Sequence, residues 1–201
     1  MSFFENTRKP TGLGGKVMLN MMNLFHAPLA DRGMKFLPLS SNAKVLDCGC
    51  GGGANIRKLL KKCPQGVVKG IDYSPVSVEK SKKVNKAAIM EGRCTVLQGS
   101  VADMMFADNW FDAVTAFETV YFWPNLPQCF REVYRVLKPG GTFLICNEAN
   151  GDTDKDEKWT EIIGGMTIYK DVELKAYLEQ AGFHDIQIHK KKSWLCITAR
   201  K

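Results

Sequence analysis

Short apolar segments alternate with longer amphipathic ones along most of the chain. The short segments are rich in Val, Ile, Leu and Phe and end at Gly, Pro or polar residues, which is typical of buried strands. They predict strands at Lys44–Cys48, Val67–Asp72, Cys94–Gln98, Phe111–Phe117, Thr142–Asn147, Ile186–His189 and Trp194–Ala199.

The amphipathic segments between these strands carry apolar residues at helical spacing. They predict helices at Ala54–Lys62, Val76–Met90, Leu126–Leu137 and Asp171–Ala181. Alternating strands and helices favour an α/β protein in which a mostly parallel sheet is covered on both faces. The last two strands follow each other closely, as in an antiparallel pair. We therefore predict a doubly wound, mostly parallel sheet of seven strands whose last strand is antiparallel.

Composition narrows the class of protein. The 201 residues are 45% hydrophobic and 24% charged, which fits one globular domain and excludes wholesale disorder. The longest stretch without an acidic or basic residue, Val17–Ala30, contains Asn, His and Pro and is shorter than the ~18 apolar residues of a membrane span. The first residues lack a signal-peptide layout. Seven irregularly spaced Cys suit unpaired thiols in a reducing compartment, so we expect a soluble cytoplasmic protein.

Positive charge is concentrated in one window of the chain. There are 28 Lys and Arg against 21 Asp and Glu, a net charge of +7. Residues 57–93 hold a large share of the basic residues, and most of the Lys there recur at helical spacing. That spacing favours the solvated outer faces of helices. The alternative is a nucleic-acid-binding face, although no aromatic residues are interleaved with the Lys to stack on bases.

The densest chemical signal is a glycine-rich turn between the first predicted strand and the first predicted helix. Its sequence is Asp47-Cys-Gly49-Cys-Gly51-Gly52-Gly53. Glycines there allow a tight turn and let a ligand approach the backbone at the carboxyl end of the strand. The spacing also meets the loose dinucleotide-binding pattern, so the glycines alone do not choose the ligand.

Two acidic residues at strand ends narrow the choice of ligand. Asp47 is poorly placed beside a pyrophosphate but suits an ammonium group, either directly or through water. Asp72 ends the second strand, where a carboxylate can accept both hydroxyls of an unmodified ribose. S-adenosylmethionine fits both observations, because it is a nucleoside with a positively charged amino-acid tail and no phosphate.

Four motifs, in order, give the chain a family resemblance. They are VLDCGCGGG (45–53), GIDYSP (70–75), QGSVADMMFADNWFDAV (98–114) and REVYRVLKPGG (131–141). With them the chain resembles the class I S-adenosylmethionine-dependent methyltransferases, especially the small-molecule group that includes the ubiquinone/menaquinone-biosynthesis methyltransferases. The resemblance runs from about Lys44 to Asn147 and weakly to the end. It implies a Rossmann-like fold and S-adenosyl-L-methionine as the cofactor.

The resemblance also implies a cofactor site, residue by residue. The loop around the methionine part of the cofactor would comprise Asp47, Gly49, Gly51 and Gly53. Asp72 would bind the ribose, and Tyr73 would lie against the adenine. Ser100 stands where the family commonly has Asp, and its hydroxyl would accept more weakly from the adenine amino group. The backbone N–H of Val101 would serve an adenine ring nitrogen.

The acceptor side is less specific, because an in-line methyl transfer depends mainly on orientation. In similar enzymes the acceptor lies beside the loop after the fourth strand, so Glu118 and Tyr121 are candidates for orienting it or handling a proton. The following Phe122 and Trp123 favour packing. In relatives a helix before the first strand caps the cofactor. Gly15–Leu29 has a suitable apolar pattern, and His26 on its polar side is the third candidate.

These expectations define one methyltransferase domain over residues 1–201, with an N-terminal helical cap at 1–40 and a Rossmann-like core at 41–201. We expect a small-molecule acceptor, with O, N, S and C acceptors all open, and an undetermined oligomeric state. No metal is expected, because Cys48 and Cys50 have no companions at zinc spacing. Neither a membrane span nor a nucleic-acid partner is expected.

Three alternatives remain open. The first is an RNA-modifying methyltransferase or nucleic-acid-binding protein that uses the basic face of residues 57–93. The second is a cofactor-binding protein without catalysis. The third is a short-chain dehydrogenase, for which Tyr134 and Lys138 have the Tyr-x-x-x-Lys spacing but stand at a helix end before Pro139.

Overall fold

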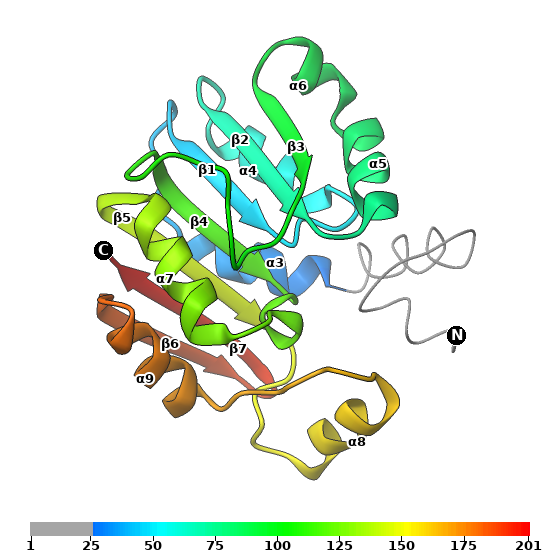
Figure 1. Ribbon diagram of the computed structural model, residues 1–201, viewed down its shortest axis with the longest axis vertical. Helices are drawn as coiled ribbons and strands as arrows, with labels where there is room; N and C mark the ends of the chain where they lie inside the picture. Colours follow the sequence, from blue (N-terminus) through cyan, green and yellow to red (C-terminus); the bar gives the residue numbers. More distant parts are fainter. Residues whose placement is uncertain (1–25) are drawn as a thin grey trace.

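A seven-stranded sheet in the order β3-β2-β1-β4-β5-β7-β6 forms the centre of the computed structural model, which describes residues 26–201 (Figure 1). The strands are β1 (Lys44–Cys48), β2 (Val67–Asp72), β3 (Cys94–Gln98), β4 (Phe111–Phe117), β5 (Leu137–Asn147), β6 (His184–Lys191) and β7 (Trp194–Arg200). The pairs among β1 to β5 are parallel, and β7 lies antiparallel between β5 and β6. The predicted α/β fold, with its Rossmann-like doubly wound sheet and antiparallel last strand, is confirmed.

Helices cover both faces of this sheet (Figure 1). One face carries α3 (Ala27–Gly33), α4 (Ala54–Lys62), α5 (Pro75–Val84) and α6 (Lys86–Met90). The other face carries α7 (Leu126–Val136) and α9 (Asp171–Gln180). Two short 3-10 turns complete the connections, η1 (Met34–Phe36) and η2 (Val120–Phe122).

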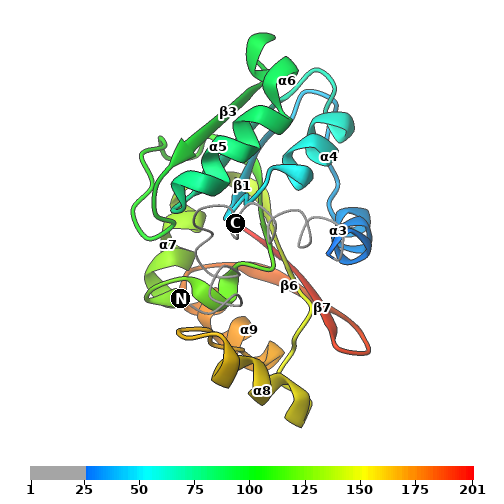
Figure 2. The same cartoon turned by 90° about the vertical axis from the view of Figure 1, so that its right-hand side faces the viewer.

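One helix and several boundaries differ from the predictions. The helix α8 (Asp154–Ile162) was not predicted; it projects from one end of the molecule after β5 (Figures 1 and 2). β6 is longer at both ends than the predicted Ile186–His189. The helix predicted at 76–90 is divided at Asn85, whose Nδ2 donates to the carbonyl oxygens of Gly53 and Ser81, both at 3.0 Å. β5 begins at Leu137 rather than Thr142, because Leu137 pairs with Phe111 before the chain turns.

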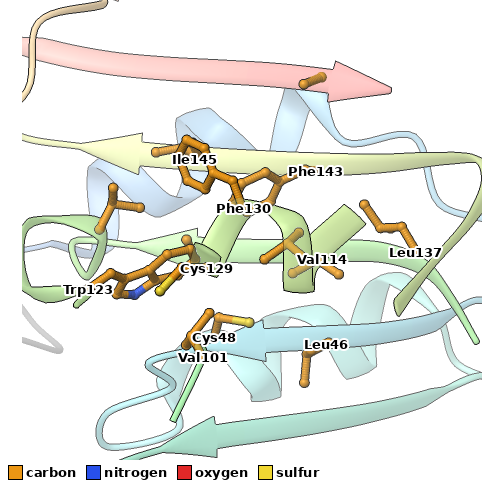
Figure 3. Close-up of a cluster of buried hydrophobic side chains, with 14 of the residues drawn as sticks. Leu46, Cys48, Val101, Val114, Trp123, Cys129, Phe130, Leu137, Phe143 and Ile145 are labelled. Atoms are coloured by element: carbon orange, nitrogen blue, oxygen red, sulfur yellow. The ribbon is translucent and has the colours of Figure 1, made fainter. Parts of the chain in front are cut away.

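Aromatic packing fixes the segment after β4 against the sheet (Figure 3). Phe130 of α7 and Phe143 of β5 are fully buried, with ring centroids 5.7 Å apart. The ring of Trp123 lies nearly parallel to that of Phe143, at 6.2 Å between centroids. Because a close-packed interior tolerates little displacement, the residues of this segment have defined positions.

Polar contacts at the start of β4 hold the opposite end of the sheet. The Asp112 carboxylate accepts from the backbone N–H of Lys44 at 2.7 Å and from Lys138 Nζ at 2.5 Å. Asp112 therefore joins the starts of β1, β4 and β5, and Lys138 is engaged there rather than beside Tyr134. All seven Cys are free and buried. Within residues 26–201, no helix is long and apolar enough to cross a membrane.

Candidate active site

The glycine turn joins β1 to α4 and lies across the end of β2. The backbone N–H groups of Gly49 and Cys50 both donate to the carbonyl oxygen of Ile71, at 2.8 and 3.1 Å. Gly49 has a φ of +71°, and a Cβ placed there would lie 2.0 Å from Thr119 Oγ1. A side chain at position 49 is therefore excluded both by the backbone conformation and by the loop after β4.

A cavity of about 410 Å³ opens at the carboxyl ends of the parallel strands. Ligands of doubly wound sheets bind at this edge. Eight of the candidate residues line the cavity, namely His26, Gly49, Gly51, Asp72, Tyr73, Ser100, Val101 and Glu118. Three do not line it, namely Asp47, Gly53 and Tyr121. Most of the candidate residues therefore line a single cavity.

Asp72 holds the glycine turn and the start of α5 while still facing the cavity. Its Oδ2 accepts from the backbone N–H of Gly51, and its Oδ1 accepts from that of Ser74, both at 2.9 Å. Burial raises the pKa of Asp72, and these two hydrogen bonds, together with one from Ser77, lower it in part. A carboxylate has about four acceptor sites, so with these three hydrogen bonds made the residue can still accept from a ligand hydroxyl group.

Asp47 lies beneath the glycine turn and is 1% exposed. Its Oδ1 accepts from Thr115 Oγ1 at 2.8 Å, whereas its Oδ2 has no hydrogen-bond partner among residues 26–201. Burial raises its pKa to about 7; the Thr115 hydroxyl lowers it, and the charge of Asp72 raises it further. A buried carboxylate oxygen without a donor is costly. A donor of positive charge is the partner that this oxygen lacks.

The three residues expected around an adenine ring all line the cavity. Tyr73 is 40% exposed, which leaves its ring accessible beside the cavity. Ser100 Oγ accepts from the backbone N–H of Ala102 at 3.2 Å, and its hydroxyl hydrogen is free to rotate toward a ligand. Val101 is 8% exposed and contributes an apolar surface.

Glu118 stands at the end of β4 in a left-handed conformation, with a φ of +58°. Its backbone N–H donates to Cys146 of β5, at 2.8 Å, and its carboxylate accepts from the backbone N–H of Glu148. Burial raises the pKa of Glu118 well above its ordinary value, and the charge of Glu148 adds to the effect. Non-glycine residues in such a conformation are uncommon and often mark functional sites.

His26 precedes α3 and reaches the same place. Its Nε2 lies 3.5 Å from Glu148 Oε2, and one ligating atom from each of His26, Glu118 and Glu148 lies within 4.8 Å of the others. Burial lowers the pKa of His26, which the charge of Glu148 raises in part, so the imidazole is mainly neutral at neutral pH. Nothing in the sequence pattern singled out Glu148. Its position after β5, at the ligand-binding edge, was the usable signal.

Part of the predicted N-terminal cap belongs to the core. Leu29 and Ala30 of α3 are buried against the sheet, and a Cβ on Gly33 would lie 2.1 Å from Cys146 Sγ. The rest of that segment, including most of the predicted helix at 15–29, lies outside the described residues.

Tyr121 occupies a different position from the one expected of an acceptor-side residue. It is 3% exposed, and its hydroxyl donates to the carbonyl oxygen of Ala149 at 3.2 Å and accepts from the N–H of the same residue at 2.9 Å. This tie joins the segments after β4 and β5. By contrast, Phe122 and Trp123, which favoured packing, both reach the cavity, and Trp123 packs in the core as well.

The strand order, the antiparallel β7 and the glycine turn below the cavity define the class I methyltransferase fold. Residues 46–145 match the family described as a methyltransferase domain, and the chain belongs to the class I S-adenosylmethionine-dependent methyltransferases. S-adenosylmethionine is the cofactor of this family.

Curated relatives of the chain include sterol methyltransferases. Cycloartenol-C-24-methyltransferase of Arabidopsis thaliana is 35% identical over 75% of this chain and 47% of its own length. Sterol 24-C-methyltransferase of Aspergillus fumigatus is 34% identical over 53% of this chain and 28% of its own length. The chain thus spans less than half the length of these relatives.

Solved structures of low identity share the fold. A chain from the complex of the Haloferax volcanii Trm112 methyltransferase activator with a methyltransferase has a TM-score of 0.82 at 22% identity, over 92% of this chain and 94% of that chain. Haemonchus contortus phosphoethanolamine N-methyltransferase 2 has a TM-score of 0.72 at 16% identity, over 85% of this chain and 52% of that chain.

The residues at the cavity fit the cofactor of this family. The buried Asp47 Oδ2 lacks a donor, and the cofactor carries an ammonium group. Asp72 presents hydrogen-bond acceptors at the cavity wall, and the cofactor carries two ribose hydroxyls. Gly49 and Gly51 both line the cavity and, without side chains, present their backbone to it.

Proposed function

We propose that the cavity at the strand ends binds S-adenosylmethionine and that the protein transfers its methyl group to a small-molecule acceptor. The observation that carries this proposal is the buried carboxylate oxygen of Asp47, which has no hydrogen-bond partner in the described part of the chain and lies below a glycine turn that Asp72 holds in place. A phosphate-bearing dinucleotide would meet these two acids with the wrong charge. A nucleoside with a positive charge would instead be attracted by these two acids.

Each candidate residue at the cavity or beneath it has a role in this proposal. Asp47 receives the ammonium group, directly or through water, and the turn through Gly49, Gly51 and Gly53 surrounds the methionine part. Asp72 accepts from the ribose hydroxyls. Tyr73, Ser100 and Val101 surround the adenine, and the N–H of Val101 serves a ring nitrogen.

The cofactor supplies a methyl group on an activated leaving group, so the chain's own residues mainly hold the acceptor in line. Orientation of this kind can supply about 7–11 kcal/mol of a barrier. Glu118 and His26 are the polar groups of the acceptor wall, and Phe117, Phe122 and Trp123 provide its apolar part. Tyr121 acts as a positioning residue through its bonds to Ala149.

The same proposal extends to the domain organisation, the location and the substrate class of the protein. We propose that residues 1–201 act as one methyltransferase domain, with residues 1–40 contributing the acceptor cap. The free, buried thiols support a reducing, cytoplasmic location. From the sterol methyltransferases we carry over the class of reaction, methyl transfer to a small molecule, and not the sterol.

Calorimetric titration of S-adenosylmethionine into the protein tests the proposal. We expect a dissociation constant in the micromolar range and a loss of at least about tenfold in affinity for Asp72→Ala, because the lost acceptor leaves ribose hydroxyls unpaired. Asp31→Ala is the matched control, since this exposed acid contacts Lys58 away from the cavity. The wild-type protein failing to bind either S-adenosylmethionine or S-adenosylhomocysteine would contradict the proposal.

A further inference from the structure

The cavity is acidic although the protein is basic. The chain carries a net charge of +7, yet no Lys or Arg is among the cavity-lining residues in the described part of the chain. Its acidic lining residues are Asp72 and Glu118, with Asp47 directly beneath the glycine turn. Carboxylates in a cavity with low-dielectric walls reinforce one another's field, so this site selects ligands by their charge.

Only part of this acidity faces the cofactor. In the proposed function Asp47 and Asp72 serve the ammonium group and the ribose. Glu118 lies at the end of β4, and Glu148 approaches it from the end of β5, with its backbone N–H bonded to the Glu118 carboxylate. His26 Nε2 completes the group at 3.5 Å from Glu148 Oε2. Of these three residues Glu118 and His26 line the cavity, and Glu148 lies directly beside them without lining it. A second acidic group thus adjoins the cavity where the acceptor is expected.

The chemistry of this second acidic group separates the possible acceptors. Glu118 and Glu148 would repel a carboxylate, phosphate or phenolate acceptor. Among the described residues that line the cavity, no Lys or Arg is present to pair with such an anion. Nucleic acid, with its phosphates, falls in the same class. An amine suits the site, because its N–H groups can donate hydrogen bonds to carboxylates. The rings of Phe117 and Phe122 also line the cavity and can attract a cation through their faces.

Resting on the proposed function, we propose that the acceptor is an amine, held as its ammonium form by Glu118 with the charge of Glu148 beside it, and that the protein is an N-methyltransferase. Glu118 takes one proton from the bound ammonium group. The nitrogen lone pair then forms the N–CH₃ bond while the CH₃–S bond breaks and leaves its electron pair on sulfur. The products are a methylated ammonium ion, a neutral thioether and a protonated Glu118.

The half-buried His26 and the more exposed Glu148 complete a route for that proton. Their side chains are 26% and 48% exposed, whereas Glu118 lies deeper. Burial raises the pKa of Glu118, so its carboxylate, once ionised beside the ammonium group, is a stronger base toward that group's proton. The same burial keeps His26 mainly neutral and therefore able to accept the proton in turn.

Three probes with one ring test the inference, namely benzylamine, benzyl alcohol and benzoate. Their binding to the complex with S-adenosylhomocysteine is measured by ligand-observed NMR, and methyl transfer is measured with S-adenosylmethionine. We expect benzylamine to bind and to be methylated, and benzoate to do neither. Glu118→Gln should weaken benzylamine binding about tenfold while S-adenosylhomocysteine affinity changes less than about twofold. Gln keeps the hydrogen bond from Glu148, so the fold should survive.

Further arms make every outcome informative. Glu148→Gln, at a more exposed residue, should weaken benzylamine binding by less, and Glu179→Gln on α9 should have no effect. Equal binding of the three probes, or no binding of any, would overturn the amine inference while S-adenosylhomocysteine binding still upheld the proposed function. Loss of amine binding on adding EDTA, restored by Zn²⁺, would assign His26, Glu118 and Glu148 to a metal instead. Absence of S-adenosylhomocysteine binding would defeat the proposed function itself.

Discussion

The buried carboxylate of Asp47 should make the protein less stable as the pH rises through neutrality, and Asp47→Asn should remove that dependence. The pKa of Asp47 is about 7 in the folded protein, against an ordinary value of 3.8. A group whose pKa is raised on folding binds a proton more tightly in the folded state. Its stabilising contribution is therefore complete at low pH and is lost as the pH rises toward the folded pKa.

The size of the effect follows from the shift. The pKa of Asp47 differs by roughly three units between the unfolded and the folded protein. At about 1.4 kcal/mol per unit, the unfolding free energy falls by about 4 kcal/mol as the pH rises from below the ordinary pKa to above the folded one. Asp47 is 1% exposed, so solvent does little to reduce the free-energy penalty of its buried charge. Relative to wild type, Asp47→Asn should gain about 2–4 kcal/mol of unfolding free energy between about pH 4.5 and about pH 7.5, because Asn carries no charge to desolvate.

Urea denaturation at several pH values measures this gain, and calorimetry on the same samples measures cofactor affinity. Asp47→Asn should bind S-adenosylmethionine at least about tenfold more weakly, since the ammonium group loses its anionic partner. Asp31→Asn, at an exposed acid, should show neither effect. A difference in stability between wild type and Asp47→Asn that does not change with pH would refute the reasoning about Asp47.

Three further changes test other parts of the site. Gly49→Ala should destabilise the protein by more than about 2 kcal/mol in denaturant, whereas Gly92→Ala, at a similar φ of +74° but with nothing within 4 Å of an added Cβ, should cost only about 1 kcal/mol; equal costs would show that the clash is not real. Tyr121→Phe should lower stability by about 1–3 kcal/mol by freeing the backbone of Ala149, with little change in cofactor affinity, and a large change in affinity would place Tyr121 at the cavity after all. Glu118→Gln should reduce affinity for the cationic S-adenosylmethionine about twofold to tenfold more than for the neutral S-adenosylhomocysteine, and equal reductions would exclude a field effect.

The cofactor half of the fold could be predicted because its signals are local. β1 to β4 have the predicted bounds, since each is a short apolar run closed by a turn. Asp47 and Asp72 could be placed at strand ends because the apolar runs that predict β1 and β2 stop at these positions. What the sequence did not show is that one oxygen of Asp47 has no donor, which depends on the packing of Thr115 from another strand.

The features that were missed depend on contacts between distant residues. The break at Asn85 is made by a hydrogen bond to Gly53, and an uninterrupted helical pattern conceals it. Glu148 joins Glu118 only because β4 and β5 are neighbours in the sheet. Tyr121 was expected at the acceptor because it follows Glu118 closely, but the 3-10 turn of η2 directs its hydroxyl to Ala149.

The most direct test of the central proposal is a crystal structure of the protein with S-adenosylhomocysteine. We predict density for the ligand in the cavity at the strand ends, with its ammonium group bonded to Asp47 directly or through one water and its ribose hydroxyls bonded to Asp72. The sulfur should face the wall that carries Glu118. Density at another place, or a ligand whose ammonium group lies away from Asp47, would contradict the proposal.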